Sequence, residues 1–223
     1  MKLIVFAFAP VLVAVVAIGC VRLSPPKNAP AVVAAPKGRT LEEKVSLLEQ
    51  CGLKLSAPFT TKDLLKSGSR EEYEKAGFEA VLVELGATAE DAPSRNYCIN
   101  LWHFDTEAIE DEGSYKKIAE RMIEMTQGSL RLENIQDHVD IENKQAWLSF
   151  SFKGRPIKID CKVEDDWVDA TIFGKFVELL KQSDPTKTYI YYDLGGQDCL
   201  IGCVSRTQFD CLKDLGLKFE PLT

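Results

Sequence analysis

Two neighbouring segments with alternating side chains constrain the fold of this chain more than any other feature. Every second residue between positions 146 and 152 is apolar, and the same alternation returns between positions 157 and 163, after Lys153 and Gly154. A period of two is typical of a strand that buries one face, and the short glycine turn joins two such strands into a β-hairpin. The expected buried face consists of Ala146, Leu148, Phe150, Phe152, Ile157, Ile159, Cys161 and Val163.

Helical patterns lie on both sides of this hairpin. Thr40, Ser69 and Ser205 each stand three residues before a Glu or Gln, which is the pattern of a capping box at a helix start. Apolar stripes predict further helices from Ser114 to Gly128 and from about Ala170 onward. The other expected elements are a short helix at residues 59–65, strands at 78–85, 97–104, 134–142, 189–192 and 199–205, and a polar loop at 87–96.

This order of elements indicates the fold class. It lacks the regular alternation of strand and helix that builds a parallel sheet. The sequence therefore predicts an α+β fold, with a largely antiparallel sheet and helices packed on one side.

The first twenty residues have the pattern of an export signal. A basic start at Lys2 is followed by an uncharged apolar run that ends at Cys20. The stretch Ala17-Ile18-Gly19-Cys20 resembles the lipobox of bacterial lipoproteins, except that Ala17 stands where a larger aliphatic residue is usual. The resemblance implies cleavage before Cys20 and lipidation of Cys20. The alternative is an uncleaved signal anchor, because residues 3–19 just reach the roughly 17–25 residues that span a bilayer.

The predicted organisation has three parts. Residues 1–19 form the lipoprotein signal peptide, residues 20–38 contain the lipidated cysteine and a linker rich in Pro and Ala, and residues 39–223 form the α+β domain. Two subdomains with a boundary near 128–133 are an alternative. We expect a lipid-anchored protein on the exported side of the cell membrane or outer membrane, with the membrane as its partner through the anchor.

The charge of the chain excludes one class of partner. The formal net charge is −7, and removal of residues 1–19 makes it −8 because Lys2 is the only charge in that segment. Binding to nucleic acid depends on clusters of Lys and Arg that contact phosphates. We therefore predict no nucleic-acid partner, whereas a protein partner remains open.

Six cysteines remain if Cys20 carries a lipid: Cys51, Cys98, Cys161, Cys199, Cys203 and Cys211. An even number of cysteines in an exported chain permits disulfides, and the spacing does not resemble a metal site. Cys199 and Cys203 would share one face of a strand but lie too far apart for an ordinary bridge. Burial as small apolar residues is the alternative for most of them.

Both histidines of the chain lie among acidic residues. If the strand with His103 and Asp105 lay beside the strand with His138 and Asp140, the four side chains could bind zinc or a harder divalent ion. They could equally form a general acid–base pair. Polar residues at a sheet edge are the alternative, and no other cofactor is expected.

Two acidic runs precede predicted helices, at residues 107–112 and 164–169. Carboxylates in this position stabilise the positive end of the helix dipole, which is one explanation of both runs. The run at 164–169 could also form a cation site or a patch for a basic partner. In such a patch Trp167, which follows Asp165 and Asp166 and is expected to be exposed, is the strongest candidate for contact because Trp often anchors interfaces.

Three functions remain open at this stage. The segments LWHFDTE and YDLGGQDCLIG resemble uncharacterised bacterial proteins, and this resemblance implies no function. The leading hypothesis is a membrane-tethered, non-enzymatic binding or interaction module. The alternatives are a metal-dependent hydrolase-like enzyme that uses the two histidines, and an immunity or inhibitor protein that binds a basic partner through its acidic loops.

Overall fold

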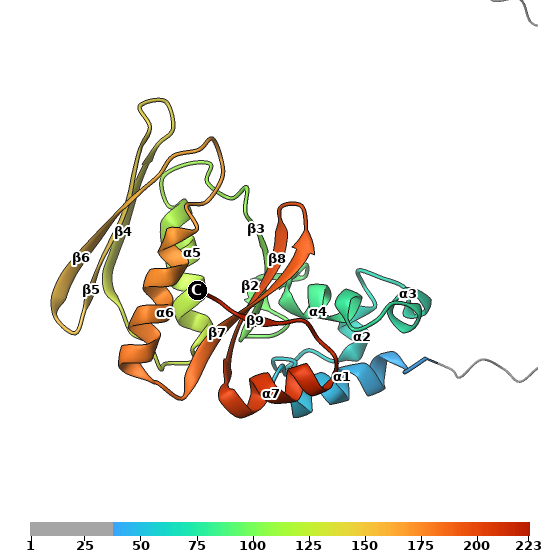
Figure 1. The fold of residues 1–223 in the computed structure, drawn as a ribbon. Helices are drawn as coiled ribbons and strands as arrows, with labels where there is room; N and C mark the ends of the chain where they lie inside the picture. Colours follow the sequence, from blue (N-terminus) through green and yellow to red (C-terminus); the bar gives the residue numbers. More distant parts are fainter. Residues whose placement is uncertain (1–37) are drawn as a thin grey trace, which may run out of the picture. The chain divides into compact units, whose positions relative to one another are not determined.

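Two antiparallel sheets organise the computed structural model of this chain, which describes residues 38–223 (Figure 1). The predicted signal peptide, Cys20 and nearly all of the linker lie outside these residues. The described helices are α1 (Leu41–Gln50), α2 (Thr61–Leu64), α3 (Arg70–Lys75), α4 (Glu79–Gly86), α5 (Ser114–Met125), α6 (Thr171–Ser183) and α7 (Arg206–Asp214). The strands are β1 (Thr88–Ala89), β2 (Ala92–Asn96), β3 (Leu101–Asp105), β4 (Glu133–Asp140), β5 (Gln145–Phe152), β6 (Arg155–Cys161), β7 (Lys187–Gly195), β8 (Asp198–Ser205) and β9 (Glu220–Pro221).

The smaller of the two sheets has the strand order β4-β5-β6, and the predicted hairpin forms its β5–β6 half. Phe150 pairs with Ile157 on the buried face, whereas Trp147 pairs with Asp160 on the opposite face. The assignment of faces from the alternating pattern is therefore confirmed.

The larger sheet has the order β3-β8-β7-β9, and all its pairs are antiparallel. Strand β8 lies in its interior, and six consecutive residues of β8, from Cys199 to Val204, are buried. Both faces of this sheet are therefore covered. A separate short hairpin of β1 and β2 lies within the segment that was expected to be a polar loop.

Two apolar cores lie on the two faces of the four-stranded sheet. In the first core α5 and α6 pack between this sheet and the buried face of the three-stranded sheet, as Figure 1 shows. In the second core α1, α4 and α7 pack against the other face, where they contact Leu101, Ile190 and Leu200.

The α+β class and the antiparallel pairing agree with the prediction. Helices cover one face of the three-stranded sheet, as expected, but they cover both faces of the four-stranded sheet. Neither core ends near residues 128–133, since both contain residues from before and after that segment.

Besides the loop expected at 87–96, a second predicted element is wrong: residues 78–85 form helix α4 instead of a buried strand. Val81, Leu82 and Leu85 face the second core at the spacing of a helix. Gly86 lets the end of this helix approach β3, because a Cβ atom there would stand 2.6 Å from the backbone nitrogen of His103. A short apolar run is ambiguous between strand and helix, and the tertiary contacts decide it here.

The predicted helix starts are confirmed at Thr40, Ser69 and Ser205. In each capping box the Ser or Thr side chain accepts the N–H of the residue three positions later, and the side chain of that residue accepts the N–H of the Ser or Thr. Of the helices in residues 38–223, none has the length and apolar character needed to cross a membrane.

Candidate binding surfaces

Two loops at one end of the domain are joined by backbone hydrogen bonds. The N–H of Ile109 donates to the carbonyl of Asp166 at 2.9 Å, and the N–H of Val168 donates to the carbonyl of Thr106 at 2.8 Å. Trp167 lies between these two bonds, and its own N–H donates to the carbonyl of Glu164 at 3.1 Å. Its backbone is thus held in place while its side chain remains 43% exposed.

The turn of the β7–β8 hairpin joins the same end of the domain. The N–H and the hydroxyl of Thr106 both donate to the carbonyl of Gln197, at 3.0 and 2.8 Å. The amide of Gln197 donates to the Asp105 carboxylate at 3.3 Å. We call residues 105–112, 164–169 and 195–198 together the acidic loop cluster.

Most carboxylates of the acidic loop cluster are exposed, and one has a structural role. Burial raises the pKa of Asp169, but hydrogen bonds from the Lys162 and Thr171 backbones and the Thr171 hydroxyl outweigh it, so the pKa lies below its usual range. Asp165, in contrast, has a left-handed backbone with φ of 57° and an exposed side chain, whereas Asp166 is partly buried. The other carboxylates in the cluster belong to Asp105, Glu107, Glu110, Asp111, Glu112, Glu164 and Asp198.

The structure does not bring the four predicted metal-binding residues together. His103 lies on β3 and His138 on β4, which belong to different sheets. Nε2 of His103 is 3.1 Å from Asp198, and Nδ1 of His138 is 3.8 Å from Glu112. The two histidines line separate cavities.

The two aspartates of that set also have other partners. Asp105 accepts the N–H of Glu107, and Asp140 accepts the N–H and side-chain amide of Asn143. The bonds from Asn143 lower the pKa of Asp140. Within residues 38–223, no group of three or more His, Cys, Asp or Glu residues could hold a metal ion.

A cleft of about 610 Å³ lies between α5 and β3, with Trp102 and Ile118 among its lining residues. Arg121 borders this cleft but is nine-tenths buried, and its guanidinium donates to the carbonyls of Cys98, Ile99 and Leu101. Glu124 pairs with the same guanidinium at 2.5 Å. Arg121 therefore fixes the segment that leads into β3.

Two other buried ionic groups were not found from the sequence. Lys44 of α1 donates to four carbonyls at the end of α3, among them Tyr73 and Gly77. Asp137 of β4 accepts the N–H groups of Gly113 and Lys116 and so caps the start of α5. Like the bonds from Arg121 to the three carbonyls, these contacts join residues at least 20 positions apart, so no local pattern could have indicated them.

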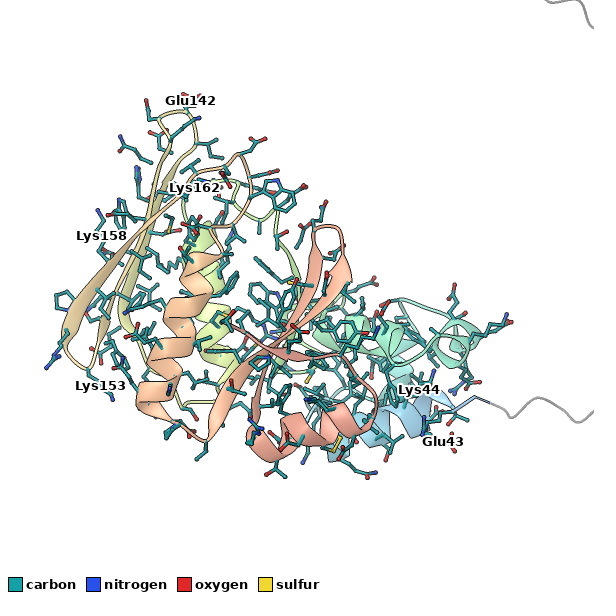
Figure 2. All side chains as sticks on the ribbon, viewed as in Figure 1. Glu43, Lys44, Glu142, Lys153, Lys158 and Lys162 are labelled. Atoms are coloured by element: carbon teal, nitrogen blue, oxygen red, sulfur yellow. A yellow bond between two sulfur atoms is a disulfide. The ribbon has the colours of Figure 1, made fainter. Side chains whose placement is uncertain are left out.

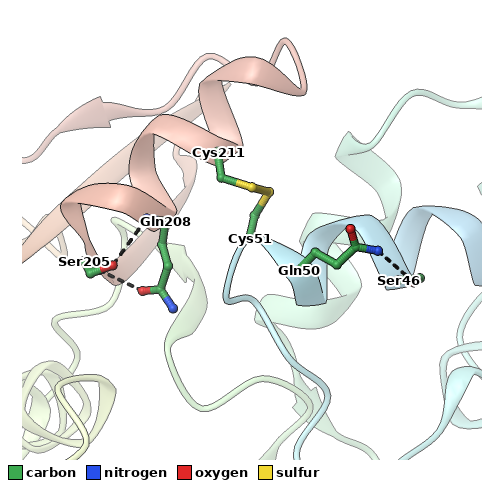
Figure 3. The surroundings of a disulfide bond; sticks show 6 residues. All are labelled: Ser46, Gln50, Cys51, Ser205, Gln208 and Cys211. Atoms are coloured by element: carbon green, nitrogen blue, oxygen red, sulfur yellow. Dashed lines mark hydrogen bonds between the residues drawn. A yellow bond between two sulfur atoms is a disulfide. The ribbon is translucent and has the colours of Figure 1, made fainter.

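One disulfide is present in the described chain, between Cys51 at the end of α1 and Cys211 in α7 (Figure 3). It joins residues separated by 160 positions. Cys98, Cys161, Cys199 and Cys203 are free and buried, as expected for small apolar residues. Burial raises the pKa of Cys98 to about 11 and of the other three to about 12, so these thiols are unreactive near neutral pH.

Comparison of the chain with protein-family models, with curated proteins and with solved structures finds no match.

Proposed function

We propose that this chain is an exported, lipid-tethered binding module that holds a basic protein partner at the acidic loop cluster. The observation that carries the proposal is the pair of backbone hydrogen bonds that joins the acidic loop of Trp167 to a second acidic loop, while the Trp167 side chain stays exposed. A Trp side chain on a rigid backbone loses little entropy on binding and contributes a large apolar contact. The surrounding carboxylates favour a partner of opposite charge and raise its association rate.

The disulfide supports the exported location independently of the signal sequence. Disulfides persist in oxidising compartments and are rare where thiols are kept reduced. Cys51 and Cys211 lie in the folded domain, apart in the sequence from the segment that resembles a lipobox. The two features therefore favour the same location on separate grounds.

The first helix of the described chain lies away from the acidic loop cluster. Figure 2 shows Glu43 and Lys44, near the start of the described chain, at one end of the domain and Lys162 and Glu142 at the other. Lys162 closely precedes the acidic run that contains Trp167. Within residues 38–223, the start of the chain and the acidic run therefore lie at different ends of the domain.

An immunity or inhibitor protein is the specific form of this function that the acidic surface favours, since an inhibitor of a basic protein needs such a surface. The hydrolase hypothesis has no comparable support, because its four residues lie on two sheets and its two histidines line different cavities.

Metabolic labelling with palmitate tests the tether. The wild-type chain should incorporate the label at Cys20, and Cys20→Ser should not. Equal label in both chains would contradict the lipid anchor, which needs more than one acyl chain for stable attachment.

Capture of partners from a cell-envelope extract tests the surface. Full-length protein in detergent serves as bait, and it is compared with Trp167→Ala, with Asp165→Asn/Asp166→Asn and with Trp147→Ala. Trp147 is a matched control because it lies on the open face of the three-stranded sheet. A partner lost with the first two variants, retained with the control and released by salt supports the proposal. A partner retained by Trp167→Ala and by the aspartate variant contradicts it.

A further inference from the structure

The hydrogen-bond ladder between β7 and the C-terminal segment covers only part of β7. The register pairs Ile190 with Pro221 and Tyr191 with Glu220, and the N–H of Leu222 donates to the carbonyl of Tyr189. In an antiparallel ladder, alternate residues direct both backbone groups to the same neighbour. Tyr189, Tyr191 and Asp193 therefore present their N–H and C=O groups on the β9 side of β7.

The next pair in this register would be Asp193 with Lys218, and it is not formed. The two segments diverge there, and a cavity of about 440 Å³ lies between them, lined by Tyr191, Asp193 and Lys218. In residues 38–223, the N–H and C=O of Asp193 on this side have no strand partner. An unpaired strand edge beside a cavity is the arrangement that accepts an added strand.

A second cavity, of about 620 Å³, adjoins the first, and Glu79 and Tyr192 line both. The hydroxyl of Tyr192 donates to Glu79 at 3.2 Å across the boundary. Apolar side chains line the second cavity, among them Phe78, Val83 and Leu217. The combined groove has an apolar part and a charged part on the same sheet edge.

The charged part favours a cation. Three carboxylates, those of Glu79, Asp193 and Glu220, line the first cavity, and Lys218 is the single basic residue among its lining residues. The side chains of an extended peptide point alternately to opposite sides. A peptide that alternates basic and apolar residues would place its cations near the carboxylates and an apolar side chain in the second cavity.

We infer that this groove binds an extended segment of a partner protein, with alternating basic and apolar residues, which adds to the free edge of β7 at Asp193. Two backbone hydrogen bonds to Asp193 position the segment, and the carboxylates and the apolar cavity select its side chains. The site lies on the β9 edge of the four-stranded sheet and does not depend on Trp167.

Fluorescence anisotropy with two labelled pentapeptides tests the inference on the full-length chain in detergent. The probes are acetyl-Lys-Val-Lys-Val-Lys-amide and acetyl-Glu-Val-Glu-Val-Glu-amide. The first should bind, and the second should bind at least tenfold more weakly. Equal affinity for both peptides, or no binding of the first, would overturn the inference.

Two variants locate the peptide. Ala80→Phe fills the apolar cavity that Ala80 lines, and Ala108→Phe puts the same ring into the cleft between α5 and β3 as a matched control. The first should reduce affinity for the basic peptide at least tenfold, and the control should not change it. Glu79→Gln/Glu220→Gln provides a second test that leaves the apolar packing intact, with the same expected loss.

The outcomes separate this site from the one around Trp167. Trp167→Ala should bind the basic peptide as tightly as the wild type. If the capture experiment finds no partner at the acidic loop cluster, the inference about the groove is therefore unaffected. Unchanged binding by Ala80→Phe and by the Glu79/Glu220 variant would overturn the groove, whatever Trp167→Ala does.

Discussion

The three-stranded sheet and the four-stranded sheet bury their strands in different ways. In β5 the buried residues alternate with partly exposed ones, because helices cover one face and water the other. In β8 six consecutive residues are buried, because helices cover both faces. The alternating pattern can be read directly from the sequence, whereas the continuous apolar pattern of β8 is also typical of a buried helix segment.

The tryptophans of the two sheets have different surroundings. Trp147 lies on the open face of the three-stranded sheet, where Lys158 stands 5.0 Å from its ring centre and His138 lies against it. Trp102 of the four-stranded sheet packs against Phe104 at 4.4 Å instead. Both tryptophans on the sheets therefore pack against neighbouring side chains and are partly buried. Trp167 in the acidic loops has a larger exposed fraction.

The largest effect is expected at the buried face of β5. Phe150→Ala should lower the free energy of unfolding by about 3–5 kcal/mol, because it removes a ring that packs against Phe176 in the first core. Denaturant unfolding of the purified domain measures the change. A cost below about 1 kcal/mol would break the assignment of this face to the core.

Neighbouring residues of β8 should both be costly, unlike neighbours in β5. Leu200→Ala acts on the second core and Ile201→Ala on the first, and each should cost about 2–5 kcal/mol in the same assay. If one of the two substitutions is nearly neutral, the four-stranded sheet is covered on one face only.

The disulfide should contribute less than either core. Cys51→Ser/Cys211→Ser should lower the free energy of unfolding by about 2–4 kcal/mol, since the bridge restricts a long loop in the unfolded chain. Cys161→Ser serves as a control that leaves the bridge intact. A thermal midpoint equal to that of the wild type would show that the bridge does not restrict the unfolded chain.

Trp147→Ala should cost about 1 kcal/mol, mainly the loss of the contact with Lys158. The comparison with Phe150→Ala is the sharpest test of a sheet with one open face. A larger cost for Trp147→Ala than for Phe150→Ala would invert the two faces.

The smallest effect is a pH dependence at Asp169. Its pKa is lower in the folded chain than the value of about 3.9 expected when unfolded, so its contribution to stability is fully present above that value. The contribution is lost as the pH falls through the lowered pKa of the folded state. The difference in stability between wild type and Asp169→Asn should be constant near neutral pH and shrink below about pH 4. A difference that persists unchanged at strongly acidic pH would contradict this role.

Local patterns predicted much of this fold. Alternation located β5 and β6, and the Ser/Thr–Glu/Gln spacing located the starts of α1, α3 and α7. Helix α4 was missed because its short sequence is mostly apolar, and it contains too few polar residues to reveal a helical period. The β1–β2 hairpin was missed because Pro93 and a polar composition are also typical of a loop.

Long-range contacts were beyond the sequence. The predicted metal site required the strands of His103 and His138 to be neighbours. Local patterns do not encode strand order, and in the structure the two histidines lie on different sheets. The pairing of Cys51 with Cys211 and the cap that Asp137 gives to α5 are likewise tertiary contacts. The sequence did identify Trp167 as exposed, since carboxylates flank it on both sides in the chain.

The most direct test of the account is oxidative footprinting of tryptophan in the full-length protein. Trp167 and Trp147 are compared in the purified chain and in the same chain on intact cells, with mass spectrometry to measure oxidation at each residue. We expect Trp167 to be protected on cells and Trp147 to be oxidised to the same extent in both samples. Equal oxidation of Trp167 in both samples, or protection of Trp147 alone, would contradict a partner at the acidic loop cluster.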